Sequence, residues 1–88
     1  MQINLSPSFK KSYKSRIAVN KKLLKQTAQR IALFESDRTS PQLHDHKLTG
    51  ARKELRAFSV TGDIRIIYIP VTEDEVIFID VGSHNQVY

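Results

Sequence analysis

The last third of the chain, from Leu55 to Tyr88, constrains the fold more than any other stretch. Three runs rich in Ile, Val and Phe are separated there by Thr61-Gly62 and by the polar segment from Thr72 to Glu75. Short β-forming runs divided by turn residues are typical of an antiparallel meander, in which each strand pairs with the next. We therefore expect a three-stranded C-terminal meander.

The two turns also predict a register. With Thr61-Gly62 as a two-residue turn and Glu73-Asp74 as the tip of the next, His84 lies opposite Asp63 at the end of the sheet. Because side chains alternate between the faces of a strand, one face should form the core and the other should gather charged groups. The predicted core face carries Leu55, Ala57, Ile64, Ile66, Tyr68, Ile77, Ile79 and Val81. The predicted charged face carries Arg56, Phe58, Asp63, Arg65, Asp80 and His84.

The N-terminal half predicts a short strand and a helical hairpin. Residues 2–5 alternate in polarity, as a strand does. Ser6-Pro7 is a helix start, because the hydroxyl caps the first turn and Pro is tolerated at the first helical position. Asn20 offers a cap for a second helix from Lys21 to about Glu35. The expected buried stripes are Phe9, Tyr13 and Ile17 in the first helix, and Leu24, Ala28, Ile31 and Phe34 or Glu35 in the second.

The segment from Asp37 to Gly50 is the one long irregular piece, and loops of this length in small domains are often functional. The order of elements predicts a single α+β domain over residues 1–88. We expect a small antiparallel sheet, made of the N-terminal strand and the C-terminal meander, with the helical hairpin packed on one face.

Composition restricts the setting. The chain has no cysteine and no apolar run close to the roughly 18 residues of a membrane span, so we expect a cytoplasmic protein that makes no membrane contact. The net charge of +5 is concentrated in residues 1–56, which carry 13 Lys and Arg against four acids. A basic half suits a polyanion or an acidic protein partner, although a solvated helix face explains it equally well.

Candidate chemistry gathers at the C-terminal end. His84 is best interpreted as an acid or base, since imidazole titrates near neutral pH and Asp63 and Arg65 lie close by. A surface histidine and a structural ion-pair network are the ordinary alternatives. Arg65 is less ordinary, because an unpaired charge in a middle strand is costly without a partner or ligand. Tyr88 is either a stacking platform for a base or the frayed end of the chain.

Other chemistries receive little support. His44, His46 and His84 are a weak candidate metal set, and we expect neither a metal nor a cofactor. The chain contains no nucleophile elbow, P-loop, dinucleotide fingerprint or zinc-finger spacing. An imidazole with arginines and an aromatic ring on a basic domain suits phosphodiester chemistry on RNA, where the 2′-OH supplies the nucleophile.

Three motifs occur in order: LHDHKLTG at residues 43–50, DIRIIY at 63–68, and GSH at 82–84 with Tyr88 beyond it. With these motifs the chain resembles the RelE/ParE superfamily of toxins from toxin–antitoxin systems, most closely the YafQ-like branch of ribosome-dependent mRNA interferases. The resemblance covers almost the whole chain. Two positions depart from the YafQ-like pattern: Ser59 stands where His is frequent, and Asp80 where several members have Arg.

The resemblance implies roles for individual residues. The implied catalytic residues are His46, Asp63, Arg65, His84 and Tyr88. We also expect RNA binding by Arg56, which matches a basic position of the family, and by the following lysines: Lys47, Lys10, Lys11, Lys14, Lys21, Lys22 and Lys25. The implied reaction is attack of an mRNA 2′-OH on the adjacent phosphate in the ribosomal A site, which leaves a 2′,3′-cyclic phosphate and a 5′-OH. His84 would protonate the leaving oxygen, or His46 with Asp63 would share the acid–base work.

The resemblance also implies partners. These are a cognate antitoxin that wraps the basic toxin, mRNA and ribosomal RNA, and operator DNA contacted only through the antitoxin. Two alternatives remain open at this point. A ParE-like gyrase inhibitor shares the fold but generally lacks this histidine set. A catalytically impaired module for antitoxin binding and DNA repression is the other, because of Ser59 and Asp80.

Overall fold

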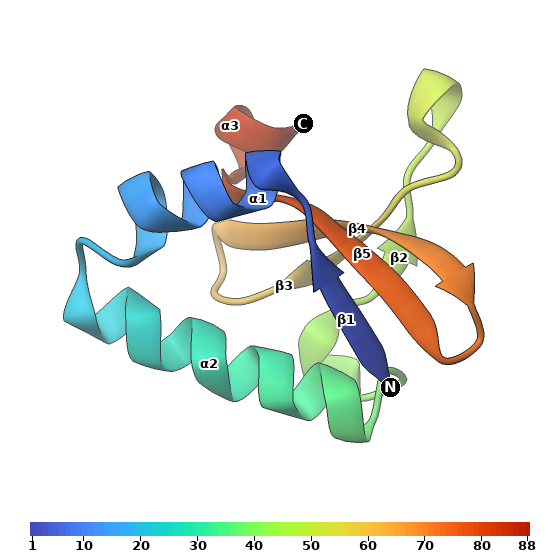
Figure 1. Ribbon diagram of the computed structural model, residues 1–88, viewed down its shortest axis with the longest axis horizontal. Coiled ribbons are helices and arrows are strands. Elements are labelled where there is room, and N and C mark those ends of the chain that lie inside the picture. Colours follow the sequence, from blue (N-terminus) through green and yellow to red (C-terminus); the bar gives the residue numbers. More distant parts are fainter.

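The structure, a computed structural model, describes all of residues 1–88 and confirms the α+β class (Figure 1). Its centre is a five-stranded sheet of order β1-β5-β4-β3-β2. The strands are β1 Gln2–Leu5, β2 His46–Lys47, β3 Arg56–Ser59, β4 Ile64–Thr72 and β5 Glu75–Ser83. The predicted C-terminal meander is present as β3, β4 and β5, which pair antiparallel in chain order.

The helices begin where the capping residues predict. The helical segments are α1 Pro7–Ser12 with a π-helical turn η1 Tyr13–Ile17, α2 Lys21–Ser36, the 3₁₀ turns η2 Pro41–Leu43 and η3 Gly50–Arg52, and α3 His84–Val87. The Ser6 hydroxyl accepts from the Phe9 N–H, and the Asn20 side chain accepts from the N–H groups of Lys22 and Leu23. These bonds satisfy donors that a helix N-terminus otherwise leaves unpaired. No helix combines the length and the apolar character needed to cross a membrane.

The main core lies between the helical hairpin and one face of the sheet. Phe34 of α2 is fully buried and its ring lies within 6 Å of three others, with centroid distances of 4.5 Å to Phe58, 4.9 Å to Tyr68 and 5.8 Å to Phe78. Stacked and edge-on pairs at such distances stabilise a core beyond the area they bury. The predicted stripe of α2 is partly wrong: Leu24 is 37% exposed and Thr27 is fully buried.

The N-terminal strand differs from the prediction of an all-antiparallel sheet. β1 pairs with β5 in parallel, with Gln2 opposite Glu75 and Leu5 opposite Phe78. The sheet is therefore mixed. Because a helical hairpin separates β1 from the meander, no local turn dictates its direction, and the packing of the hairpin on the sheet does so instead.

The turn between β3 and β4 is one residue longer than predicted. Val60 N–H donates to the Ile64 carbonyl at 2.8 Å, so three residues, Thr61 to Asp63, form the loop. Phe58 consequently pairs with Ile66, and Ser59 is the residue opposite Arg65. A shift of one residue moves every side chain of a strand to the other face.

The prediction of the two faces is therefore wrong for β3 and for part of β5. Arg56 and Phe58 lie on the core face, whereas Leu55 and Ala57 lie on the opposite one. In β5 a bulge between Asp80 and Phe78 changes the alternation, so that Phe78 and Val76 enter the core in place of Ile77 and Ile79. The predicted core positions Ile64, Ile66, Tyr68 and Val81 are correct.

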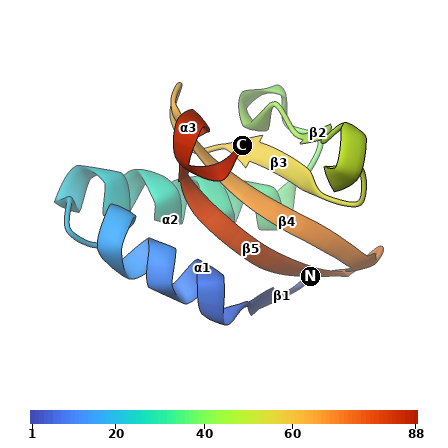
Figure 2. The same ribbon diagram turned by 90° about the horizontal axis from the view of Figure 1, so that it is seen from above.

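The second face of the sheet is not purely polar. Ala57, Ile67 and Val87 form a small buried cluster there, with Leu48, Leu55 and Ile79 packed around it. Val87 belongs to α3, which lies on the side of the sheet opposite α2 (Figures 1 and 2). The C-terminal helix is therefore fixed against the sheet, beside the end where Asp63 and Arg65 are located.

Candidate active site

The predicted meeting of His84 and Asp63 is present. Asp63 lies in the turn that leads into β4, and His84 is the first residue of α3, directly after β5. The backbone N–H of His84 donates to Asp63 Oδ1 at 3.4 Å. The register that brings them together, with Ile64 opposite Ser83, is the one expected from the second turn.

Tyr88 lies between two histidines from different parts of the chain. Its ring meets the His84 ring edge-on with centroids 4.5 Å apart, and its hydroxyl lies 3.5 Å from His46 Nε2. His46 Nδ1 lies 2.9 Å from the His44 carbonyl oxygen. Because a carbonyl only accepts, Nδ1 carries the proton when the ring is neutral, which leaves Nε2 as an acceptor. His46 thus directs a basic nitrogen toward Tyr88.

Burial raises the pKa of the Tyr88 hydroxyl above its ordinary value, although the positive charges of Arg65 and Arg52 act in the opposite direction. Tyr88 therefore remains a neutral phenol near pH 7 and can donate a hydrogen bond. A neutral donor between two imidazoles can orient a phosphate oxygen or a nucleotide without adding a negative charge to the site.

His46, Asp63, His84 and Tyr88 form a cluster at the end of the sheet, and Arg65 supplies its positive charge. Its guanidinium donates to the Ser59 hydroxyl and, at 3.3 Å, to the Gly62 carbonyl. No carboxylate pairs with it, so its charge is left uncompensated by the protein. Ser59, the position that departs from the YafQ-like pattern, is the side chain that holds this guanidinium in place.

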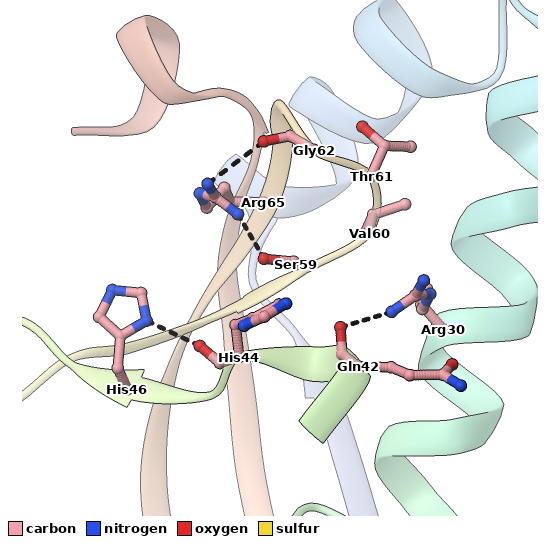
Figure 3. A pocket seen from close by; sticks show the side chains of 9 residues that line it. All are labelled: Arg30, Gln42, His44, His46, Ser59, Val60, Thr61, Gly62 and Arg65. Atoms are coloured by element: carbon pink, nitrogen blue, oxygen red, sulfur yellow. Dashed lines mark hydrogen bonds between the residues drawn. The ribbon is translucent and has the colours of Figure 1, made fainter. Parts of the chain in front are cut away.

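A cavity of about 420 Å³ opens beside the cluster (Figure 3). It is lined by Arg30, Gln42, His44, His46, Ser59, Val60, Thr61, Gly62 and Arg65. No Asp or Glu is among them, and four of the nine side chains are arginine or histidine. The electrostatic potential of such a cleft favours an anion.

Two hydrogen bonds and one close approach fix the position of α3 and therefore of His84 and Tyr88. Arg52 Nη1 donates to the Val87 carbonyl at 2.6 Å, and the Ser83 N–H donates to Gln86 Oε1 at 2.8 Å. At Gly82 an added Cβ would lie 2.6 Å from Gln86 Oε1 and 2.8 Å from Arg16 Nη1, so both side-chain ends would have to move, and it would lie 3.1 Å from Gln86 Cβ. Glycine at this position lets α3 fold back closely over the end of β5.

Arg56 is not part of this cluster. Its Nε donates to Asp45 Oδ1 at 3.1 Å and to the Tyr68 hydroxyl at 3.3 Å. Burial lowers the Arg56 pKa, but these two partners outweigh it and the net shift is upward. The expectation that Arg56 shares a face with Arg65 is wrong because of the longer β3–β4 turn.

The predicted RNA-binding lysines divide into two groups. Lys10, Lys11, Lys14, Lys21, Lys22 and Lys25 are all exposed on the helical hairpin, and none lines the cavity. Lys47 lies on the other side, in a shallow pocket that it shares with His46 and Tyr88. Asp80 bonds to Arg16 at 3.4 Å, away from the imidazoles.

Sequence reasoning missed several residues of the site. Arg30 and Gln42 line the cavity, and Arg52 fixes the C-terminal helix. Arg30 was visible only as one of many basic residues on a helix, since no local pattern shows which cation reaches the sheet. His44 entered only as a candidate metal ligand, and no group of three or more His, Asp or Glu side chains converges to hold a metal ion.

Comparisons with known proteins give a consistent result. A family model described as a bacterial toxin of type II toxin–antitoxin systems, YafQ, matches residues 1–88. A copper-bound mutant toxin from Helicobacter pylori is 28% identical, with a TM-score of 0.73 and coverage of 100% of this chain and 99% of the other. YafQ from E. coli strain BL21(DE3) is 23% identical, with a TM-score of 0.80 and coverage of 99% and 97%.

The E. coli DinJ-YafQ complex contains a chain of the same fold, 22% identical, with a TM-score of 0.80 and coverage of 99% and 97%. The search of curated proteins found no similar sequence.

Proposed function

Because the chain belongs to the YafQ family of bacterial toxins from type II toxin–antitoxin systems, we propose that it is an endoribonuclease that cleaves mRNA in the ribosomal A site and thereby inhibits translation. The observation that carries the proposal is the cluster at the end of the sheet. Two imidazoles from distant segments flank Tyr88, next to an arginine that no carboxylate neutralises.

Each part of the cluster has a task in the reaction. The nucleophile is the 2′-OH of the substrate, which attacks the adjacent phosphorus as the bond to the 5′-oxygen of the next nucleotide breaks. His46 Nε2, free to accept a proton, suits the general base that takes the 2′-OH proton. His84 suits the general acid that protonates the leaving 5′-oxygen. The products are a 2′,3′-cyclic phosphate and a 5′-OH.

The remaining residues stabilise and orient. The Arg65 fork matches the geometry of phosphate oxygens and would stabilise the extra charge of the phosphorane. Asp63 holds the first turn of α3 through the His84 N–H, so it positions His84. Tyr88 would orient the nucleotide through its hydroxyl or its ring.

The cognate antitoxin is the proposed protein partner, since the similar E. coli YafQ occurs in a complex with DinJ. An acidic or amphipathic antitoxin segment would complement the basic toxin and block the cluster. Contact with operator DNA would then be made only through that complex, and the reaction would take place in the cytoplasm.

Induced expression followed by primer extension on a reporter mRNA, with and without translation, tests the proposal. Wild-type protein should produce cleavage stops only when the message is translated. His84→Ala should lower cleavage by a factor of about 10²–10⁴, the usual contribution of one acid or base. Asn85→Ala, a change at the next exposed residue of α3, is the matched control and should cleave like wild type.

Undiminished cleavage by purified His84→Ala would remove His84 from the chemistry. Absence of cleavage by the wild-type protein, with or without translation, would overturn the endoribonuclease assignment.

A further inference from the structure

The cavity beside the cluster is lined by two arginines that no acid neutralises. The ion pairs of the protein lie elsewhere, between the Met1 amino group and Asp74, Arg16 and Asp80, and Arg56 and Asp45. Arg30 of α2 and Arg65 of β4 both reach the cavity, although they come from opposite layers of the fold. Uncompensated guanidiniums that converge on one cleft indicate an anionic ligand.

Arg30 retains most of its hydrogen-bonding capacity. One of its nitrogens, Nη1, donates to the Gln42 carbonyl at 2.6 Å, which positions the side chain at the cavity wall. A guanidinium has five N–H donors, so further donors remain for a ligand. Figure 3 shows Arg30 on one side of the cavity, Arg65 and His46 on the other, and His44 between them.

His44 adds a third hydrogen-bonding side chain, and its backbone conformation is unusual. Its φ of 48° and ψ of 39° lie in the left-handed region, which residues other than glycine rarely adopt. The same conformation directs the His44 carbonyl to His46 Nδ1. One residue therefore contributes both to the orientation of the proposed base and to the wall of the cavity.

We propose that this cavity is a subsite for the nucleotide next to the scissile bond, with the phosphate of that nucleotide held by Arg30 and His44. The inference rests on the proposed function and extends it. The scissile phosphate lies at His46, His84 and Tyr88, and Arg65 borders both positions. A cavity of about 420 Å³ falls within the range of small-ligand sites.

RNA fits the cavity better than an acidic peptide segment does. The lining contains a single hydrophobic residue, Val60, whereas a protein segment that docks by an amphipathic face needs an apolar surface. The cavity also shares His46 and Arg65 with the proposed chemistry, so a strand that passes the cluster continues into it.

The test measures binding of a short single-stranded RNA to the His84→Ala protein, so that cleavage is not required. Arg30→Gln should weaken binding roughly tenfold, the loss expected for one charge-assisted hydrogen bond to phosphate. It should also reduce the slope of log K against log salt concentration by about 0.7. Lys53→Gln, at an exposed lysine that does not line the cavity and has no proposed role in RNA binding, is the control and should change affinity little.

A neutral methylphosphonate linkage placed on either side of the cleavage point identifies the phosphate. At one of these two linkages the neutral group should weaken RNA binding by the protein that retains Arg30. At the same linkage it should not weaken RNA binding by the Arg30→Gln variant any further. His44→Gly, which keeps the left-handed backbone accessible, should show the same coupling at that linkage. Thermal unfolding of each variant establishes that it is folded.

Additive effects at both linkages, or unchanged RNA affinity in Arg30→Gln, would overturn the subsite. So would loss of oligoglutamate binding in Arg30→Gln with RNA binding intact, which would assign the cavity to an acidic peptide. If the wild-type protein fails to cleave mRNA but the coupling is found, the nucleotide subsite stands and the nuclease assignment falls.

Discussion

At the scale of single residues, Asp45 connects the histidine-rich loop of residues 44–46 to the core. The Tyr68 hydroxyl donates to Asp45 Oδ2 at 2.6 Å, and Arg56 donates to both partners. Arg38 also reaches the Tyr68 hydroxyl at 3.4 Å and lies over its ring, 5.7 Å from the centroid. Asp45 stands between His44 and His46, so this network fixes the segment that presents both imidazoles.

Tyr68→Phe should lower the free energy of unfolding by about 1.5–3 kcal/mol near neutral pH, because it removes a hydrogen bond to a charged carboxylate. Burial, with a further contribution from Asp45, raises the pKa of Tyr68 to about 12, above its value of 10.0 in an unfolded chain. Below pH 10 Tyr68 is protonated in both the folded and the unfolded state, so its contribution to stability is constant. Between pH 10 and 12 only the unfolded state ionises, so the stability that Tyr68 provides is lost as pH rises.

Urea unfolding of wild type and Tyr68→Phe across this alkaline range measures the effect, and the difference between them should shrink toward pH 12. Tyr13→Phe, at a half-buried tyrosine of the hairpin outside the network, is the control. A constant difference at all pH values would refute a role for Tyr68 ionisation.

At the scale of elements, the position of the C-terminal helix α3 determines where His84 and Tyr88 lie. It has only four residues and a single buried side chain, Val87, so its own helical propensity cannot hold it in place. Its position depends on the Arg52 bond to the Val87 carbonyl, the Gln86 cap and the close approach permitted by Gly82.

Gly82→Ala should loosen α3 and reduce cleavage, because the new methyl group presses on Gln86 Cβ at 3.1 Å and moves Gln86 Oε1 away from the Ser83 N–H that donates to it. Overpacking of this kind typically costs about 1–3 kcal/mol. Faster hydrogen exchange of the α3 amides, together with reduced cleavage, is the expected result. Asn85→Ala, at an exposed residue of α3 itself, is the control and should leave exchange and cleavage unchanged. Equal behaviour of the two variants would argue against α3 as the element that positions His84.

At the scale of the whole molecule, the positive charge is divided between two surfaces. The helical hairpin carries six exposed lysines, whereas the proposed chemistry lies at the end of the sheet and on the face that α2 does not cover. The lysines are therefore free to hold a second polyanion at the same time. Ribosomal RNA is the candidate that the proposed function implies.

Reversal of Lys11, Lys14 and Lys22 to Glu should weaken co-sedimentation with ribosomes and flatten its salt dependence by about 0.7 for each RNA phosphate that is no longer bound. The fold should be unchanged, because all three side chains are exposed. The same three positions changed to Arg keep the charge and should retain association. If the Glu variant associates like wild type at every salt concentration, the lysines serve antitoxin docking or solubility instead.

Local sequence determined much of this protein. The capping residues Ser6 and Asn20 set the helix starts, and the turn at residues 73–74 predicted the register of His84 and Asp63, which two offsetting register shifts between β4 and β5 preserve. These features depend on hydrogen bonds between residues close in sequence, or on strands joined by a short turn. Three motifs in order were also enough to predict the family.

Only the tertiary structure decided the rest. β1 entered parallel to β5, one extra turn residue moved Arg56 to the core face, and a bulge exchanged Ile79 for Phe78 in the core. Arg30 reached the cavity from a helix distant in sequence from Arg65. The physical reason is the same in each case: packing between layers selects among arrangements that local patterns allow equally, and a shift of one residue reverses the face of every side chain in a strand.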